Sequence, residues 1–309
     1  QSAGEPVPHG KQLRALAHLI AAECSHALQD RATRESHLHN ALEEAPAKGN
    51  GQDQELREGA QIRAARWSLD DRDPNATLER LAALPQGAAR RTLALRIRLK
   101  ATRQARQTRE ALDTARLLGK HRAFSAGAAQ SIVRGLAIEL IQSAHDPAQL
   151  VQIWASLENS ERNMPELAVQ AAQRLAHLGG DPAQVRAWLL PVWERMVELP
   201  DGLPEGLALK LIHCLEDGLS TIDAGWLARI EAAQQANPRD ARLQYLAGMA
   251  CLKRQLWGKA QQLLTQAASQ LTDKSLRASA WRNLAELAEQ RGDSEAAARA
   301  WKSAAQQQR

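Results

Sequence analysis

Histidine and cysteine are the residue types here best suited to metal or heme chemistry, and their spacing does not form a ligand set. The chain has nine His and three Cys. His37 and His39 are two residues apart, which places them on different faces of a helix. His213 and Cys214 are adjacent and diverge for the same reason. Because no Cys-x-x-Cys, Cys-x-x-Cys-His or His-Glu-x-x-His motif occurs either, we predict no metal site.

Nucleophilic catalysis also lacks a signature. The sequence has no Gly-x-Ser-x-Gly motif and no phosphate-binding glycine loop, and Gly179-Gly180-Asp181 is typical of a turn between helices. We therefore predict that the protein is not an enzyme and has no resident cofactor. An axial heme ligand requires only one His, so a heme-binding or porphyrin-carrying domain is the alternative function. The candidate ligands for that alternative are His18, His26, His121 and His213.

Basic residues concentrate between positions 90 and 109, where eight Arg or Lys occur without one acid, in a chain of net charge +5. Arg96, Lys100 and Arg103 are four and three apart, so they share one face of the expected helix. Such a face would attract an acidic peptide, a porphyrin propionate or anionic lipid. The alternative is a solvated face whose charges pair with acids of neighbouring helices. The stretch has no aromatic residue for base stacking, so we expect no nucleic-acid partner.

An apolar contact could complete such a surface. Tyr245 and Met249 are four apart on another expected helix and would share a face. Aromatic side chains in a groove are typical anchors for a partner protein. The predicted partner-binding groove therefore combines Arg96, Lys100, Arg103, Tyr245 and Met249.

The elements that must position these residues are helices. Ala, Leu, Gln, Arg and Glu dominate the composition, and β-branched residues in alternation are lacking. Helix starts are marked by Asp-Pro pairs, as at Asp146-Pro147, because Asp caps a helix and Pro suits its first turn. No apolar run approaches the roughly 20 residues of a membrane span. The fold class is predicted to be all-α.

A repeat is clearest at the C-terminus. Its residues fall at the tetratricopeptide offsets, which alternate large and small side chains so that two helices cross closely. They are Trp281, Leu284, Ala285, Ala288, Gly292, Ala297, Trp301 and Ala304. Trp281 and Trp301 are expected to fill core gaps, while Gly292 permits the turn. The preceding repeat carries Gly248, Cys251, Ala260, Leu264 and Ala267 at equivalent offsets.

Together these features predict a tetratricopeptide-like right-handed α-solenoid of about 14 helices in seven hairpins. It would form one domain over residues 1–309, with degenerate hairpins in 1–160 and clearer repeats in 161–309. Residues 45–52 are expected to be a flexible link. Cys24, Cys214 and Cys251 each lie among apolar helical neighbours, which favours buried free thiols and a reducing compartment.

Three segments resemble a known family. Trp226-Leu-Ala-Arg-Ile230, Asn237-Pro-Arg-Asp240 and Gln255-Leu-Trp-Gly-Lys-Ala260 are similar to the C-terminal half of HemY proteins, with Leu256 to Ala260 the most specific piece. The resemblance extends over nearly the whole chain, but its sharp motifs lie in the last third. It implies a tetratricopeptide scaffold associated with a late step of protoheme biosynthesis, whose partners are heme-biosynthesis enzymes.

The resemblance also implies a location. HemY proteins carry two membrane helices before the repeat domain, and this sequence begins at Gln1 without them. We therefore expect a preceding inner-membrane anchor, with this domain facing the cytoplasm. The family has no motif of catalytic residues that could be transferred to this chain.

Overall fold

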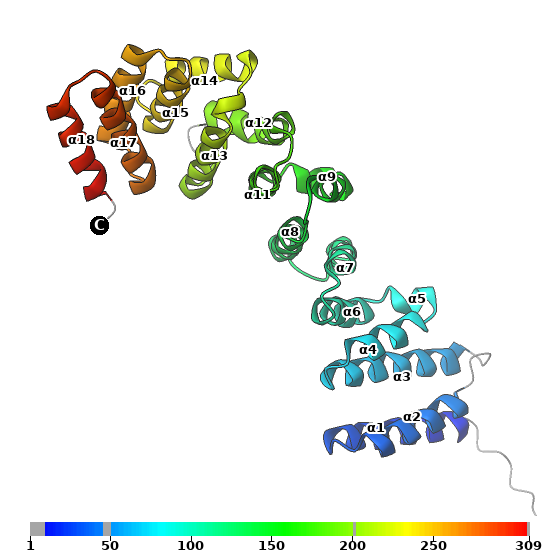
Figure 1. Cartoon of the computed structure of the whole chain (residues 1–309). Coiled ribbons are helices and arrows are strands. Elements are labelled where there is room, and N and C mark those ends of the chain that lie inside the picture. Colours follow the sequence, from blue (N-terminus) through cyan, green and yellow to red (C-terminus); the bar gives the residue numbers. More distant parts are fainter. Residues whose placement is uncertain (1–9, 46–50, 200–201, 308–309) are drawn as a thin grey trace, which may run out of the picture. The chain divides into compact units, whose positions relative to one another are not determined.

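The structure is a computed structural model that describes residues 10–45, 51–199 and 202–307, and this part of the chain contains helices and no strand (Figure 1). The predicted all-α class is confirmed. The centre of the expected flexible link, residues 46–50, lies outside the described ranges. No helix in those ranges is both long and apolar enough to cross a bilayer.

The helices outnumber the prediction of about 14. Sixteen α-helices of nine or more residues occur in the described ranges, together with two four-residue helices and one 3-10 turn. They are α1 (Gly10–Ala27), α2 (Arg31–Glu44), α3 (Gly51–Asp70), α4 (Pro74–Ala82), α5 (Gln86–Ala89), α6 (Thr92–Gln104), α7 (Thr108–Lys120), α8 (Ala126–Gln142), α9 (Pro147–Ser156), α10 (Asn159–Arg162), α11 (Pro165–His177), α12 (Pro182–Glu198), α13 (Glu205–Asp217), η1 (Leu219–Thr221), α14 (Ala224–Ala236), α15 (Ala241–Lys253), α16 (Trp257–Gln270), α17 (Lys274–Gln290) and α18 (Ser294–Gln306).

The chain forms two compact units, Gln1–Leu140 and Ile141–Arg309. Within each unit the closest packing joins consecutive helices, as in α1 with α2 or α17 with α18. The sequence predicts one domain, with degenerate hairpins before about residue 160 and clearer repeats after it. That prediction concerns the repeat pattern and stays a prediction.

One turn geometry joins many of the consecutive helices. The residue after the helix end takes a left-handed φ, and the next backbone N–H donates to the carbonyl five residues earlier, as Asp293 donates to Ala288 over 3.0 Å. This is the Schellman ending of a helix. In the described ranges it occurs at seven residues, namely Gln29, Arg72, Arg106, Arg122, Gly179, Gln255 and Gly292.

Aspartate begins many of the helices. Its carboxylate accepts a hydrogen bond from a first-turn N–H, which satisfies a backbone donor that the helix itself leaves unpaired. The caps are Asp30, Asp73, Asp146, Asp181, Asp223, Asp240, Asp273 and Asp293. Asp caps and Schellman turns therefore mark many of the helix boundaries in the described ranges.

In the first unit, α3 is buried on two faces. Ala60, Ala64 and Trp67 pack with residues of α1 and α2 in one core cluster. Ile62 and Leu69 pack with residues of α4 and α6 in another. Because its two faces are held by different neighbours, α3 links the first pair of helices to α6.

In the second unit, small residues lie where helices cross. A Cβ on Gly248 would approach the Leu264 side chain to 2.9 Å, so α15 and α16 touch at this point. Ala260 and Ala285 are fully buried, and Ala297 is 4 % exposed. Such contacts need the absence of side-chain bulk.

Three of the expected burials differ in the structure. Trp301 is 39 % exposed and does not fill a core gap, because α18 packs on α17 through its alanine face. Its indole N–H instead donates to Glu289 over 2.7 Å. Trp281 is only partly buried. Cys24 is an exposed free thiol, whereas Cys214 and Cys251 are buried as expected.

Candidate functional site

A groove opens in the first unit along the basic helix α6, which we call the α3–α6 groove. Its volume is about 510 Å³. Lys100 and Arg96, both predicted site residues, lie along it and are exposed. The complete lining is Arg66, Leu69, Asp70, Leu93, Arg96, Ile97, Leu99, Lys100 and Phe124.

The groove combines positive charge with an exposed apolar floor. Three cations line it against one carboxylate, that of Asp70. Leu93 is 56 % exposed although it is a large apolar side chain. Exposed apolar surface beside cations is the combination that an amphipathic partner would contact.

Arg96 has a structural contact as well. Its guanidinium donates to the Ala123 carbonyl over 2.8 Å and lies 5.5 Å from the centre of the Phe124 ring. Arg96 therefore holds the segment after α7 against the groove. Lys100 has no such partner in the described ranges, so its ammonium is available to a ligand.

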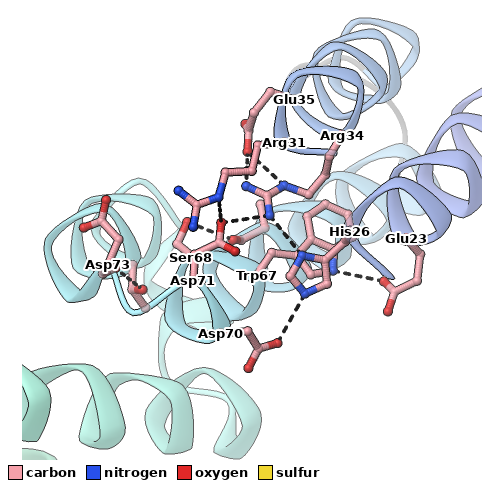
Figure 2. A network of polar contacts seen from close by, with 12 residues as sticks. Glu23, His26, Arg31, Arg34, Glu35, Trp67, Ser68, Asp70, Asp71 and Asp73 are labelled. Atoms are coloured by element: carbon pink, nitrogen blue, oxygen red, sulfur yellow. Dashed lines mark hydrogen bonds and ion pairs between the residues drawn. The ribbon is translucent and has the colours of Figure 1, made fainter. Parts of the chain in front are cut away.

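A polar network adjoins this groove at Asp70 and holds the end of α3 (Figure 2). Its centre is Arg34 of α2, which is 4 % exposed. The Arg34 guanidinium donates to Asp71 over 2.9 Å and to Glu35 over 3.0 Å. Burial raises the pKa of Glu35, but hydrogen bonds from Arg80 and Arg34 outweigh it and leave that pKa below its ordinary value. The network thus joins α2 to the residues that follow α3.

The network also determines the tautomer of His26. Arg34 Nη1 lies 2.9 Å from His26 Nδ1, and a guanidinium can only donate, so Nδ1 accepts. A neutral His26 then carries its hydrogen on Nε2, which lies 3.6 Å from Asp70 in the groove wall (Figure 2). The His26 imidazole therefore connects the buried Arg34 with Asp70, the acid in the groove lining.

The structure separates the predicted site residues. Arg103 is exposed on α6 but does not line the groove. The prediction that Tyr245 offers an aromatic contact is wrong, because its side chain is fully buried in the second unit. Met249 is 8 % exposed, and the prediction that it is an accessible anchor is also wrong. Both side chains are covered by neighbouring helices, and the helical period of the sequence does not show where those helices lie.

Tyr245 instead belongs to a buried polar cluster. Its hydroxyl donates to Glu216 over 2.5 Å and lies 2.8 Å from the Ser279 hydroxyl. Burial and the Glu216 charge raise the pKa of Tyr245, so the phenol stays a donor. His213 approaches the other Glu216 oxygen at 3.6 Å. Glu216 therefore connects α13 with α15, and Tyr245 extends the contact to α17.

This cluster predicts a pH dependence of stability. The hydrogen bond to Glu216 raises the pKa of His213 against a smaller effect of burial. A raised pKa stabilises the fold below the unfolded value, near 6.5, and this contribution is lost as pH rises through the folded value. We expect His213→Gln to reduce the loss of stability between pH 6 and 8 by less than about 1 kcal/mol, since the ring is partly exposed. Urea unfolding at fixed ionic strength measures it, and equal pH profiles for both proteins would contradict it.

The other candidate heme ligands do not line the groove. His18 Nδ1 lies 3.0 Å from His37 Nδ1, and His26 is engaged as described. His121 is exposed just after α7. In the described ranges no three His, Cys, Asp or Glu side chains come together as a metal site.

The apolar half of the α3–α6 groove is not evident from the sequence. Leu93 and Phe124 belong to different segments, and Arg66 lies on α3, so their meeting depends on packing.

In the second unit, Leu256 and Trp257 are 43 % and 39 % exposed at the α15–α16 turn. Exposed large apolar side chains in a helical pattern look like core residues from the sequence alone.

Comparison with known proteins gave no assignment. No protein-family model matches the chain, and a search of curated proteins found no match.

Proposed function

We propose that this chain is a partner-binding scaffold domain, similar to HemY, that serves a late step of protoheme biosynthesis. The support for this family is the run of motifs at helix boundaries in the second unit. Asp240 caps α15, Gln255 takes the left-handed turn conformation, and Trp257 begins α16. The resemblance also implies attachment to the inner membrane with this domain on the cytoplasmic side.

The proposed architecture is a tetratricopeptide-like right-handed solenoid of helical hairpins. Its support is the recurrence of one turn between closely packed consecutive helices, as at Gln29, Arg72 and Gly292. Repeat proteins of this kind build each unit from the same local geometry and expose extended binding surfaces. A scaffold role follows from such surfaces without any catalytic group.

The α3–α6 groove carries the proposal. We assign to it a partner-protein segment that bears acidic and apolar side chains. The acids would meet Lys100 and Arg66, and the apolar residues would cover Leu93 and the Phe124 ring. Charge complementarity of this kind steers association and fixes orientation, while the apolar contact supplies affinity.

The test reverses charge inside and outside the groove. Arg66→Glu with Lys100→Glu removes two cations from the lining, and Arg103→Glu with Arg109→Glu makes the same change on exposed residues outside it. Arg96 is left intact because it holds Ala123. We expect roughly tenfold weaker binding for the groove variant, about 0.7 kcal/mol for each reversal.

The measurement is retention of the heme-biosynthesis enzymes by the full-length membrane form of each variant, followed by titration of the retained enzyme. The outer variant should bind as the native chain does. Equal loss in both variants would indicate a general charge effect, and no loss in the groove variant would reject the groove as the binding site.

A further inference from the structure

A second cavity lies in the other unit, between the end of α11, the start of α12, the end of α13 and η1. Its volume is about 600 Å³, within the range of small-molecule sites. Val185 and Leu215 form an apolar wall, and Gln173, His177 and Arg186 contribute polar groups. All of these residues belong to the second unit, so the cavity is independent of the α3–α6 groove.

Arg186 is the unusual group in this cavity. It is 8 % exposed, and its Nε has no hydrogen-bond partner in the described ranges. The nearest carboxylate, on Asp223, lies 3.3 Å from Nε without hydrogen-bond alignment and is itself half exposed. The oxygen near Arg186 is Oδ2, while the other Asp223 oxygen, Oδ1, caps α14 by accepting from the Trp226 N–H over 2.8 Å. The guanidinium also reaches the Thr221 hydroxyl only at 3.4 Å.

Such an arrangement is costly unless a ligand completes it. A buried guanidinium has five donors in a planar fork, and leaving even one of them unsatisfied, as with Arg186 Nε, costs free energy. A carboxylate or sulfonate fits this fork with two parallel hydrogen bonds. The apolar wall beside it favours an organic acid over a hydrated inorganic anion.

The remaining groups do not compete for that role. Burial raises the pKa of the Cys214 thiol to about 12, so it stays neutral. Burial and the Glu216 charge raise the pKa of Asp217 at the cavity edge. A carboxyl with this tendency opposes a second anion less than an ordinary aspartate would.

We propose that this cavity binds a small organic acid, whose anionic group is held by Arg186 and whose apolar body lies against Val185 and Leu215. This is a small-molecule site and goes beyond the proposed binding of partner proteins. Its failure would leave the α3–α6 groove unaffected, because the two sites share no residue.

The probe is 8-anilinonaphthalene-1-sulfonate, an aromatic anion, compared with N-phenyl-1-naphthylamine, which lacks the sulfonate. We expect Arg186→Gln to raise the dissociation constant of the anion at least tenfold and to leave that of the neutral dye unchanged. Arg229→Gln, which removes an exposed charge from α14, is the matched control and should bind both dyes as the native chain does. Far-UV circular dichroism checks that each variant is folded.

A second pair of variants keeps Arg186 and avoids the question of folding. Ser220 is exposed and lines the cavity, so Ser220→Glu should weaken binding of the anion and Ser220→Lys should strengthen it, each by severalfold. Sulfate at equal ionic strength should displace the dye poorly if the apolar wall matters. Anion binding that is absent from the native chain, or unchanged by Arg186→Gln and by both Ser220 variants, would overturn the proposal.

Discussion

Arg34→Ala is expected to destabilise the first unit by about 3 kcal/mol, because it removes a buried guanidinium and leaves the partly buried carboxylates of Asp71 and Glu35 without its hydrogen bonds. Arg34 contacts Asp71, Glu35 and His26 through one planar guanidinium that is almost wholly buried. Its carbon also lies 5.9 Å from the Trp67 ring, so part of the loss is packing. Urea unfolding followed by circular dichroism measures the change.

The matched control is Arg31→Ala. Arg31 also approaches Asp71, at 3.3 Å, but its side chain is 66 % exposed. An exposed ion pair contributes at most about 1 kcal/mol, so the two alanine variants should differ severalfold. Arg34→Lys should be intermediate, since one ammonium cannot replace the guanidinium fork. Equal losses of unfolding free energy in Arg31→Ala and Arg34→Ala would show that the buried Arg34 does not stabilise the network more than the exposed Arg31 does.

Weakened packing of the first unit should also affect the groove. Leu69 and Asp70 line the groove, and Asp71 follows them directly and binds Arg34. Hydrogen exchange in the Arg34→Ala protein should therefore increase most in α2 and at the end of α3. Exchange that changed only in the second unit would contradict this assignment.

Gly248→Val is expected to destabilise the second unit by about 1–3 kcal/mol through overpacking. A first side-chain atom at this position meets Leu264 at 2.9 Å and the Leu263 Cβ at 3.3 Å. Both lie on α16, so the added bulk forces α15 and α16 apart. The free energy of unfolding, measured in urea for the full chain, reports the effect.

Gly258→Val provides the comparison at an open position. No atom lies within 4 Å of a Cβ built there, and the residue belongs to the first turn of α16. Valine has a slightly higher helix propensity than glycine and meets no neighbour here, so the change should stay within about 0.5 kcal/mol. In addition, Leu264→Ala should cost less in the Gly248→Val protein than in the native chain, because the removed atoms are those that clash. Strict additivity would mean that the two residues do not compete for space.

The sequence alone determined the helices and many of their ends. Propensity and capping act within a few residues, so composition predicted the all-α class, and pairs such as Asp146-Pro147 marked real helix starts. The turn at Gly292 followed from glycine's freedom at positive φ. The same turn at Arg72 and Gln255 could not be read locally, because packing of the flanking helices imposes a conformation that these residues rarely adopt.

The sequence shows where the basic residues of α6 cluster, but it does not show which of them line a groove. The periodicity of α6 placed Arg96, Lys100 and Arg103 on one helix face, and the structure puts only the first two in the groove. Tyr245 followed the same period and proved to be buried. A helical repeat shows which residues share a face, whereas burial depends on which other helix covers that face.

The tertiary structure decided the sites. Arg34 meets an acid 37 positions away, and the cavity around Arg186 is lined by residues of α11, α13 and η1. Helix formation depends on neighbours along the chain, but the cost of burying a charge depends on neighbours in space, and only the packed fold brings those together.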